Sequence, residues 1–194
     1  MRLRGYDSGM NTPAESTPGE LGAKPSCNIE LKARLVSLEA ARQVATALAD
    51  TQLPDQHQVD TYFHCQDGRL KLRQIDGERA ELIAYRRANE NGPKASNYFV
   101  LPVEQPERFK EALATTLGIR SRVEKRREIY LHRNVRIHLD RVTGLGEFLE
   151  FEAVLGDEHR EAESQQLVRE LRQRFAIADS DLLEASYGEM IESA

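Results

Sequence analysis

Charged side chains stand at every second position in several segments of this chain, and they are sorted by sign. Arg69, Lys71 and Arg73 share one such face, while Glu150 and Glu152 share another. Lysine and arginine hold phosphate oxygens through charge-assisted hydrogen bonds, and carboxylates hold hard divalent cations such as Mg²⁺. The two sets together suit metal-assisted phosphoryl or nucleotidyl transfer.

The alternation that sorts these charges is the period of a β-strand. In the segment 28–35, for example, Ile29, Leu31 and Ala33 share one face and Glu30 and Lys32 the other, which predicts a strand with one apolar and one charged side. The same reading gives eight strands over Asn28–Leu35, Val59–Cys65, Arg69–Ile75, Arg79–Arg87, Asn97–Val103, Ser121–Leu131, Asn134–Val142 and Glu147–Leu155.

Turns and helical spacing complete the predicted elements. The Asp67-Gly68 pair is a strong hairpin signal, and short connections of this kind favour an antiparallel sheet. Apolar residues at helical spacing predict three helices, over Leu38–Asp50, Pro106–Leu117 and about Glu158–Phe175, with Ser37 as the N-cap of the first. The predicted class is therefore α+β and mostly β.

Eight strands are enough to close a barrel around a small ligand. If the charged faces point inward, the interior holds many cations and several carboxylates, and buried charges need partners. A polyanion joined to the carboxylates by a divalent metal would satisfy both sets. The alternative is an ordinary sheet whose charged faces point into solvent and form cross-strand salt bridges.

Composition narrows the class of protein. The chain has 194 residues and a net charge of −5, which fits one domain over 27–194 after a Gly-, Pro-, Ser- and Thr-rich leader over 1–26. Mild acidity argues against binding to nucleic acid, and the apolar runs are too short to span a membrane. The two cysteines, Cys27 and Cys65, form no CxxC pair, so we expect a cytoplasmic protein. Cys65 falls on the face of its strand opposite Tyr62 and His64, and we expect it in the core rather than as a nucleophile.

Six segments, in order, resemble the signature of the CYTH superfamily, the triphosphate tunnel metalloenzymes. The resemblance covers 28–187 and is carried by Asn28-Ile-Glu-Leu-Lys32, Asp60-Thr-Tyr-Phe63, Leu70-Lys-Leu-Arg73, Lys125-Arg-Arg127, Arg136-Ile-His-Leu-Asp140 and Phe148-Leu-Glu-Phe-Glu152. The family includes class IV adenylate cyclases, thiamine triphosphatases and inorganic triphosphatases. The resemblance implies a closed eight-stranded antiparallel barrel, a triphosphate tunnel, with helices packed outside.

The resemblance also implies roles for individual residues. Glu30, Glu150 and Glu152 match metal ligands for Mg²⁺ or Mn²⁺, with Asp140 as a ligand or near neighbour. Lys32 and Tyr62 match a pair that helps to activate water in family hydrolases. The matches to phosphate-binding residues are Lys71, Arg73, Arg87, Lys125, Arg127 and Arg136.

Three functions are compatible with these residues. The first is metal-dependent hydrolysis of inorganic tripolyphosphate, thiamine triphosphate or a nucleoside triphosphate, by a monomer or homodimer. The second is conversion of ATP to cyclic AMP and pyrophosphate, as in class IV adenylate cyclases. The third is a non-catalytic triphosphate-binding barrel, because Asn28 stands where the family has the first Glu of its opening strand.

Two further residues lie near these motifs. His138 falls on the inward face of its strand, where it is either an ordinary hydrogen-bonded histidine or a phosphate contact. Lys94 follows Gly92-Pro93 and is expected in a solvated loop.

Overall fold

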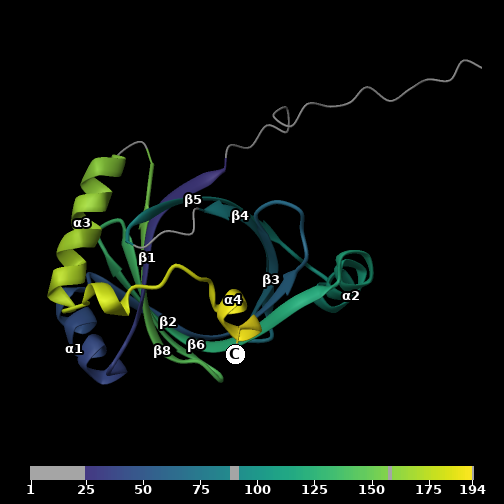
Figure 1. Cartoon of the computed structure of the whole chain (residues 1–194), viewed down its shortest axis with the longest axis horizontal. Helices are drawn as coiled ribbons and strands as arrows, with labels where there is room; N and C mark the ends of the chain where they lie inside the picture. Colours follow the sequence, from purple (N-terminus) through teal and green to yellow (C-terminus); the bar gives the residue numbers. More distant parts are fainter. Residues whose placement is uncertain (1–24, 88–91, 157–158, 194) are drawn as a thin grey trace, which may run out of the picture.

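Eight antiparallel strands form a closed barrel in the computed structural model, which describes residues 25–87, 92–156 and 159–193 (Figure 1). The order around the barrel is β1-β5-β4-β3-β2-β6-β7-β8. The strands are β1 Ser26–Arg34, β2 Thr51–Phe63, β3 Arg69–Ile75, β4 Arg79–Arg87, β5 Lys94–Pro102, β6 Ile119–His132, β7 Val135–Val142 and β8 Gly146–Val154. The predicted barrel is confirmed, whereas residues 1–24 of the predicted leader lie outside the described residues.

Asp-Gly pairs lie in the connections on both sides of β3, and one of them is the predicted Asp67-Gly68 turn. Asp76 and Gly77 both have positive φ, 53° and 73°, as a tight type I′ connection between β3 and β4 requires. Gly68, with φ of 73°, follows β2, and a Cβ added there would lie 2.8 Å from the carbonyl oxygen of Tyr85. Both connections therefore depend on backbone that a bulkier residue would strain.

Two parts of the prediction were wrong. The strand predicted to begin at Val59 begins at Thr51. Its first half pairs with β6 across a register shift between Leu53 and Gln56. This half therefore lacks the simple alternation from which strands were predicted. Pro54 lies in this irregular stretch, where a missing backbone N–H is tolerated. The structure also has a fourth helix, α4 (Tyr187–Glu192), that the predicted elements do not include.

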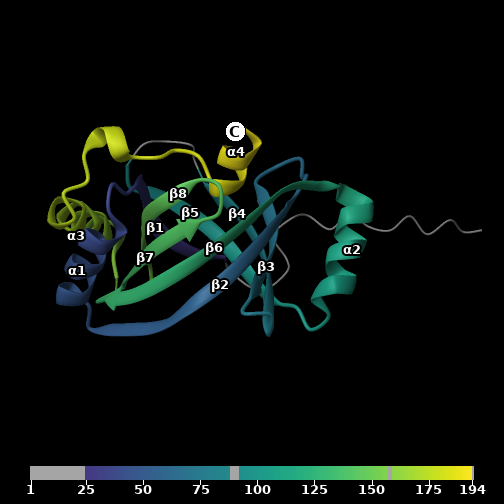
Figure 2. The same cartoon turned by 90° about the horizontal axis from the view of Figure 1, so that it is seen from below.

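The three predicted helices pack on the outside of the barrel. Figures 1 and 2 show α1 (Leu38–Leu48) and α3 (Glu161–Arg174) on one side and α2 (Pro106–Leu117) on the other. Ser37 caps α1 as predicted, its Oγ accepting a hydrogen bond from the Ala40 backbone N–H at 3.2 Å. None of the described helices combines the length and apolarity needed to cross a membrane.

The hydrophobic core lies outside the barrel wall rather than inside it. The outward faces of β1, β7 and β8 pack against α1 and α3, with Leu31, Ile137 and Phe151 fully enclosed. The opposite, charged faces are buried too: Glu30, Lys32, Lys125 and Glu150 are at most 8% exposed. The charged faces therefore point into the barrel, and the alternative of a solvated outer face is wrong. Cys65 is exposed rather than part of the core.

Candidate functional site

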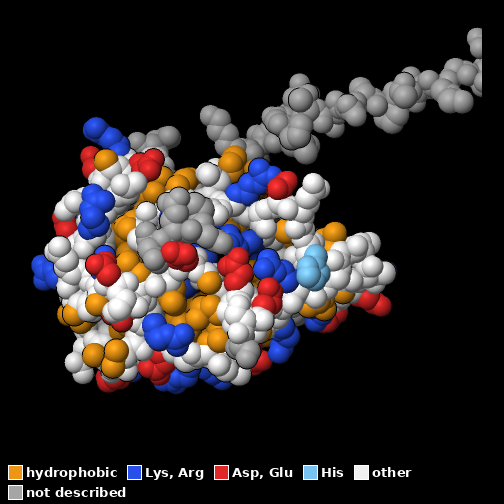
Figure 3. Space-filling view, viewed as in Figure 1, with side chains coloured by type: hydrophobic (Ala, Val, Ile, Leu, Met, Phe, Trp, Pro, Cys, Tyr) orange, Lys and Arg blue, Asp and Glu red, His pale blue; other side chains and the backbone are white. Residues whose placement is uncertain are grey.

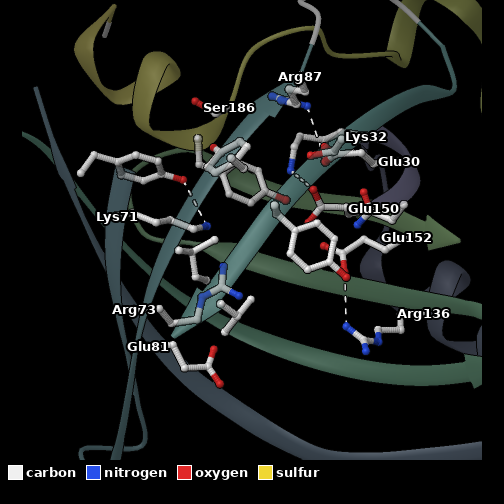
Figure 4. A pocket seen from close by; sticks show the side chains of 18 of the residues that line it. Glu30, Lys32, Lys71, Arg73, Glu81, Arg87, Arg136, Glu150, Glu152 and Ser186 are labelled. Atoms are coloured by element: carbon white, nitrogen blue, oxygen red, sulfur yellow. Dashed lines mark hydrogen bonds and ion pairs between the residues drawn. The ribbon is translucent and has the colours of Figure 1, made fainter. Parts of the chain in front are cut away.

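A cavity of about 170 Å³ occupies the interior of the barrel, and all eight strands contribute to its lining (Figure 4). Ten of the predicted site residues line it: Glu30, Lys32, Tyr62, Lys71, Arg73, Arg87, Lys125, Arg136, Glu150 and Glu152. The remaining two, Arg127 and Asp140, do not line it. They are buried next to its residues and joined to them by hydrogen bonds and ion pairs.

An acidic wall, consisting of Glu30, Glu150 and Glu152, lies on β1 and β8. Glu30 stands directly opposite Glu152 in the pairing of these strands, and Lys32 opposite Glu150. Burial, and then the neighbouring charge of Glu150, raises the pKa of Glu30 above its ordinary value. Burial alone would raise the pKa of Glu150, but the charge of Lys32 helps to hold this pKa well below the usual range. Three carboxylates therefore converge, and one of them resists ionisation.

A basic wall, consisting of Lys71 and Arg73 on β3, is held by one carboxylate of β2. Asp60 accepts hydrogen bonds from Arg73 Nε at 2.8 Å, Arg73 Nη2 at 2.9 Å and Lys71 Nζ at 2.8 Å. Asp60 is 1% exposed, and Arg73 and Lys71 overcome the effect of burial and keep its pKa well below normal. The basic wall therefore has its own counter-ion and fixed side-chain positions.

A second buried network joins β6, β7 and α4. Arg127 donates two hydrogen bonds to Asp140, at 2.7 and 2.6 Å, and a third to Glu150 at 2.7 Å. Tyr187 donates to Asp140 Oδ2 at 2.8 Å. Lys125 Nζ is 3.6 Å from the same oxygen, and burial together with Arg127 lowers its pKa to about 7. Both oxygens of Asp140 are thus engaged by side chains of the protein.

Lys32 and Tyr62 both face the cavity, but each contacts a different partner. Lys32 Nζ donates to Glu150 Oε1 at 2.7 Å and lies 3.8 Å from the centre of the Tyr187 ring. The Tyr62 hydroxyl oxygen lies 3.5 Å from Lys71 Nζ. Burial raises the pKa of Tyr62, so its phenol stays protonated at neutral pH. Tyr62 is therefore a hydrogen-bond donor rather than a base.

The remaining two cations, Arg87 and Arg136, approach the acidic wall less closely. Arg87 Nη1 is 3.7 Å from Glu30, and its Nη2 donates to the carbonyl oxygen of Glu184 at 3.2 Å. Arg136 Nη1 is 4.0 Å from Glu152, and its side chain is 50% exposed. These separations are longer than those of the buried networks, so the charges of Glu30 and Glu152 are less completely neutralised.

The C-terminal segment also contributes to the site, which the predicted elements and motifs did not include. Ser186 and Tyr187 line the cavity, and α4 lies across one of its ends (Figures 1 and 4). Lys, Arg, Asp and Glu side chains gather around α4 on the face shown in Figure 3. The Ser186-x-x-Glu189 spacing was the available signal, since the two side chains form a reciprocal capping box. Gly188 permits the close approach, because a Cβ there would lie 2.9 Å from Ser121 Oγ.

Two more buried residues were unforeseen. Asp60 was matched only as part of a motif, and its role in fixing the basic wall follows from the pairing of β2 with β3. Lys94, expected in a solvated loop, lies in β5 and is 4% exposed. Burial, followed by the charge of Arg87, lowers its pKa to about 8. The prediction of a loop at Lys94 was wrong because β5 begins at this residue, three residues before the predicted start at Asn97.

The acidic wall has the donor chemistry of a divalent cation site. Its ligand atoms are carboxylate oxygens, which hard cations prefer. The amide oxygen of Asn28 also faces this cavity, is buried, and accepts no hydrogen bond from the described residues. A buried oxygen without a donor is costly, and a bound cation would satisfy it. The residues therefore fit a metal ion.

Many solved structures share this fold, and three of them illustrate the similarity. A Pyrococcus horikoshii protein is 23% identical, with a TM-score of 0.74 over 84% of this chain and 98% of its own. A candidate adenylate cyclase from Vibrio parahaemolyticus is 20% identical, with a TM-score of 0.72 over 87% and 99%. An adenylyl cyclase candidate from Hippeastrum, described as having dominant triphosphatase activity, is 16% identical, with a TM-score of 0.59 over 86% and 95%.

Comparisons at the level of sequence identify the family. A search of curated proteins found no match. The family model of the CYTH domain matches residues 26–187, which is the whole barrel together with the segment leading into α4. The chain therefore belongs to the CYTH family.

Proposed function

We propose that this protein hydrolyses a triphosphate in a metal-dependent reaction inside the barrel. The observation that supports this most is the separation of charge across one cavity, with cations on β3 and β6 and carboxylates on β1 and β8. A triphosphate joined to a divalent metal has the complementary arrangement of charge. Membership of the CYTH family and the triphosphatase activity named for the Hippeastrum protein agree with this function.

The basic wall is proposed to bind the phosphates. Among the described residues, the contacts of Arg73 with Asp60 use Nε and Nη2, which leaves Nη1 for a phosphate oxygen. Because Asp60 already fixes the guanidinium, little side-chain entropy is lost when the anion arrives. The proposed phosphate-binding residues that line the cavity are Lys71, Arg73, Arg87, Lys125 and Arg136. Arg127, which does not line it, is proposed to add its positive charge from behind the lining.

The acidic wall is proposed to hold Mg²⁺ or Mn²⁺ through Glu30, Glu150 and Glu152. Such an ion supplies charge stabilisation for the transferring phosphoryl group. Asp140 takes the role of near neighbour in this proposal, because it is buried behind the cavity lining and does not face the cavity as Glu150 does. It orients Arg127, which in turn contacts Glu150.

Lys32 and Tyr62 are proposed to orient the attacking water. Both face the cavity and carry N–H or O–H donors. The water oxygen forms a bond to the terminal phosphorus while the bond from that phosphorus to the bridging oxygen breaks. The products are orthophosphate and the corresponding diphosphate.

Product analysis tests this proposal. The purified chain is incubated with tripolyphosphate, thiamine triphosphate or ATP, each with Mg²⁺ or Mn²⁺, and the products are separated by anion exchange. Orthophosphate with the matching diphosphate would support the proposal and identify the substrate. Cyclic AMP with pyrophosphate would replace it with adenylate cyclase activity. Product formed only by the Asn28→Glu variant would instead indicate a triphosphate-binding barrel.

A further inference from the structure

A histidine faces the acidic wall from the neighbouring strand. His138, on β7, stands directly opposite Glu150 of β8 and is 3% exposed. Its Nδ1 makes no hydrogen bond with any described residue. One oxygen of Glu150 and one of Glu152 each lie 3.8 Å from this nitrogen, which is too long for a hydrogen bond. A buried ring nitrogen is thus aimed between two carboxylates without a hydrogen bond to either.

The spacing of these atoms fits a shared metal ion. One ligand atom from each of His138, Glu150 and Glu152 lies within 4.8 Å of the others. Two ligands bound at roughly 2.1 Å to the same transition-metal ion are separated by at most about 4.2 Å. The two distances of 3.8 Å satisfy this limit as they stand. The third pair, one oxygen of Glu150 and one of Glu152, is separated by at most 4.8 Å, so a shift of up to about 0.6 Å brings it within the same limit.

We propose that His138 is a nitrogen ligand of the metal held by Glu150 and Glu152, and that the site therefore prefers Mn²⁺ to Mg²⁺. Imidazole suits first-row transition ions, whereas Mg²⁺ prefers an all-oxygen shell and gives up its waters reluctantly. The inference deepens the proposed function, because it concerns the metal of the same site.

A competing arrangement uses the same three residues without a metal. A protonated His138 would form an ion pair with both carboxylates and would itself be the cation of the acidic wall. The two arrangements predict opposite effects of removing the imidazole. Loss of a ligand weakens metal binding, whereas loss of a positive charge beside the carboxylates strengthens it.

Electron paramagnetic resonance of the metal-free full chain titrated with Mn²⁺ distinguishes them. A coordinated imidazole gives ¹⁴N modulation in the spin-echo signal of bound Mn²⁺, and we expect this modulation in the wild type and not in His138→Gln. The variant should bind Mn²⁺ roughly tenfold or more weakly, while its Mg²⁺ affinity, measured by competition, changes less than about twofold. The control is His57→Gln, since His57 pairs with Glu124 and does not line the cavity.

Three results would overturn the inference: absence of ¹⁴N modulation from bound Mn²⁺ in the wild type, tighter metal binding by His138→Gln, or no Mn²⁺ binding at all. The wild-type spectrum decides the ligand even if the variant fails to fold. The proposed function fails separately. Mn²⁺ bound with ¹⁴N modulation but without hydrolysis of any triphosphate would keep His138 as a ligand and remove the hydrolase assignment.

Discussion

The acidic and basic walls of the cavity differ in how their charges are neutralised. On the basic wall, Lys71 and Arg73 contact Asp60 at 2.8 Å. On the acidic wall, the ion pairs of Glu30 and Glu152 with arginines are 3.7 and 4.0 Å long. Short hydrogen bonds to Asp60 fix the basic wall, which keeps one positive charge in excess of this counter-ion. On the acidic wall, Glu150 is paired at 2.7 Å with both Lys32 and Arg127, whereas Glu30 and Glu152 have only the looser pairs. This difference agrees with the proposed cation at the acidic wall and the proposed anion at the basic wall.

The layers behind the two walls differ as well. The strands of the acidic wall are backed by α1 and α3, which bury Leu38, Leu167 and Leu171 against them. On the other side, α2 buries none of its residues fully. Apolar burial contributes roughly 25 cal/mol per Å², so the acidic wall rests on the better-stabilised part of the barrel. Carboxylates held close together repel one another, and the apolar burial behind the acidic wall offsets the destabilising effect of this repulsion.

The largest expected effect is on the basic wall. Asp60→Asn keeps the size of the side chain but removes the buried charge shared by Lys71 and Arg73. Breaking a buried ion pair from one side costs about 3–5 kcal/mol, and we expect this loss in the free energy of unfolding measured with urea. Glu152→Gln is the control from the acidic wall, and its loose contacts predict a change within about 1 kcal/mol. Equal stability of Asp60→Asn and the wild type would remove the distinction between the walls.

The next effect is on turnover. Glu152→Gln is expected to reduce metal-dependent kcat by about 100-fold, because the proposed metal loses a charged ligand. The matched control is Glu147→Gln on the same strand, whose side chain contacts Arg141 and the Leu38 backbone outside the cavity. Glu150→Ala is a poorer test, since it also leaves Lys32 without its buried ion-pair partner and removes one of the two carboxylates that Arg127 contacts. Full activity of Glu152→Gln would remove Glu152 from the metal site.

Strand parity explains how much of this site was predictable. Alternation alone placed Glu30, Arg73 and Glu150 on the charged faces of their strands, because the period of a strand is two whatever its neighbours are. That these faces point inward depended on the closure of eight strands into a barrel. Contacts between inward residues depend on the register of neighbouring strands. The pairing of Asp60 with Arg73 could not be predicted, because this register is not encoded in the alternation. The contact of Tyr187 with Asp140 joins residues 47 positions apart through a helix of one or two turns, which carries little periodicity.

Binding of the anion should depend on pH through Lys125. In the free protein its pKa is lowered to about 7, so it loses its proton as the pH rises past neutrality. A bound polyanion favours the protonated form, and affinity should therefore fall from pH 6 to pH 8. We expect the tripolyphosphate affinity of the wild type to fall up to about tenfold more than that of Lys125→Met over this range. Calorimetry at both pH values measures it, and the titration of tripolyphosphate itself cancels in the comparison.

The smallest effect should reverse its sign with metal. Burial and Glu150 raise the pKa of Glu30, and a carboxyl group whose pKa is higher in the folded state loses stabilising effect as the pH rises through that value. Glu30→Gln removes this penalty, so at pH 7 the metal-free variant should be more stable than the wild type by up to about 1 kcal/mol. This gain in stability should vanish below a pH of about 4.3, which is the pKa of a glutamate in the unfolded chain. With saturating Mn²⁺ the wild type should become the more stable protein, because ligand binding stabilises the folded state. Urea denaturation with and without Mn²⁺ measures the difference in stability between the two proteins in both conditions. A metal-free variant that is less stable than the wild type would show that Glu30 is neutralised within the protein, as Asp60 is.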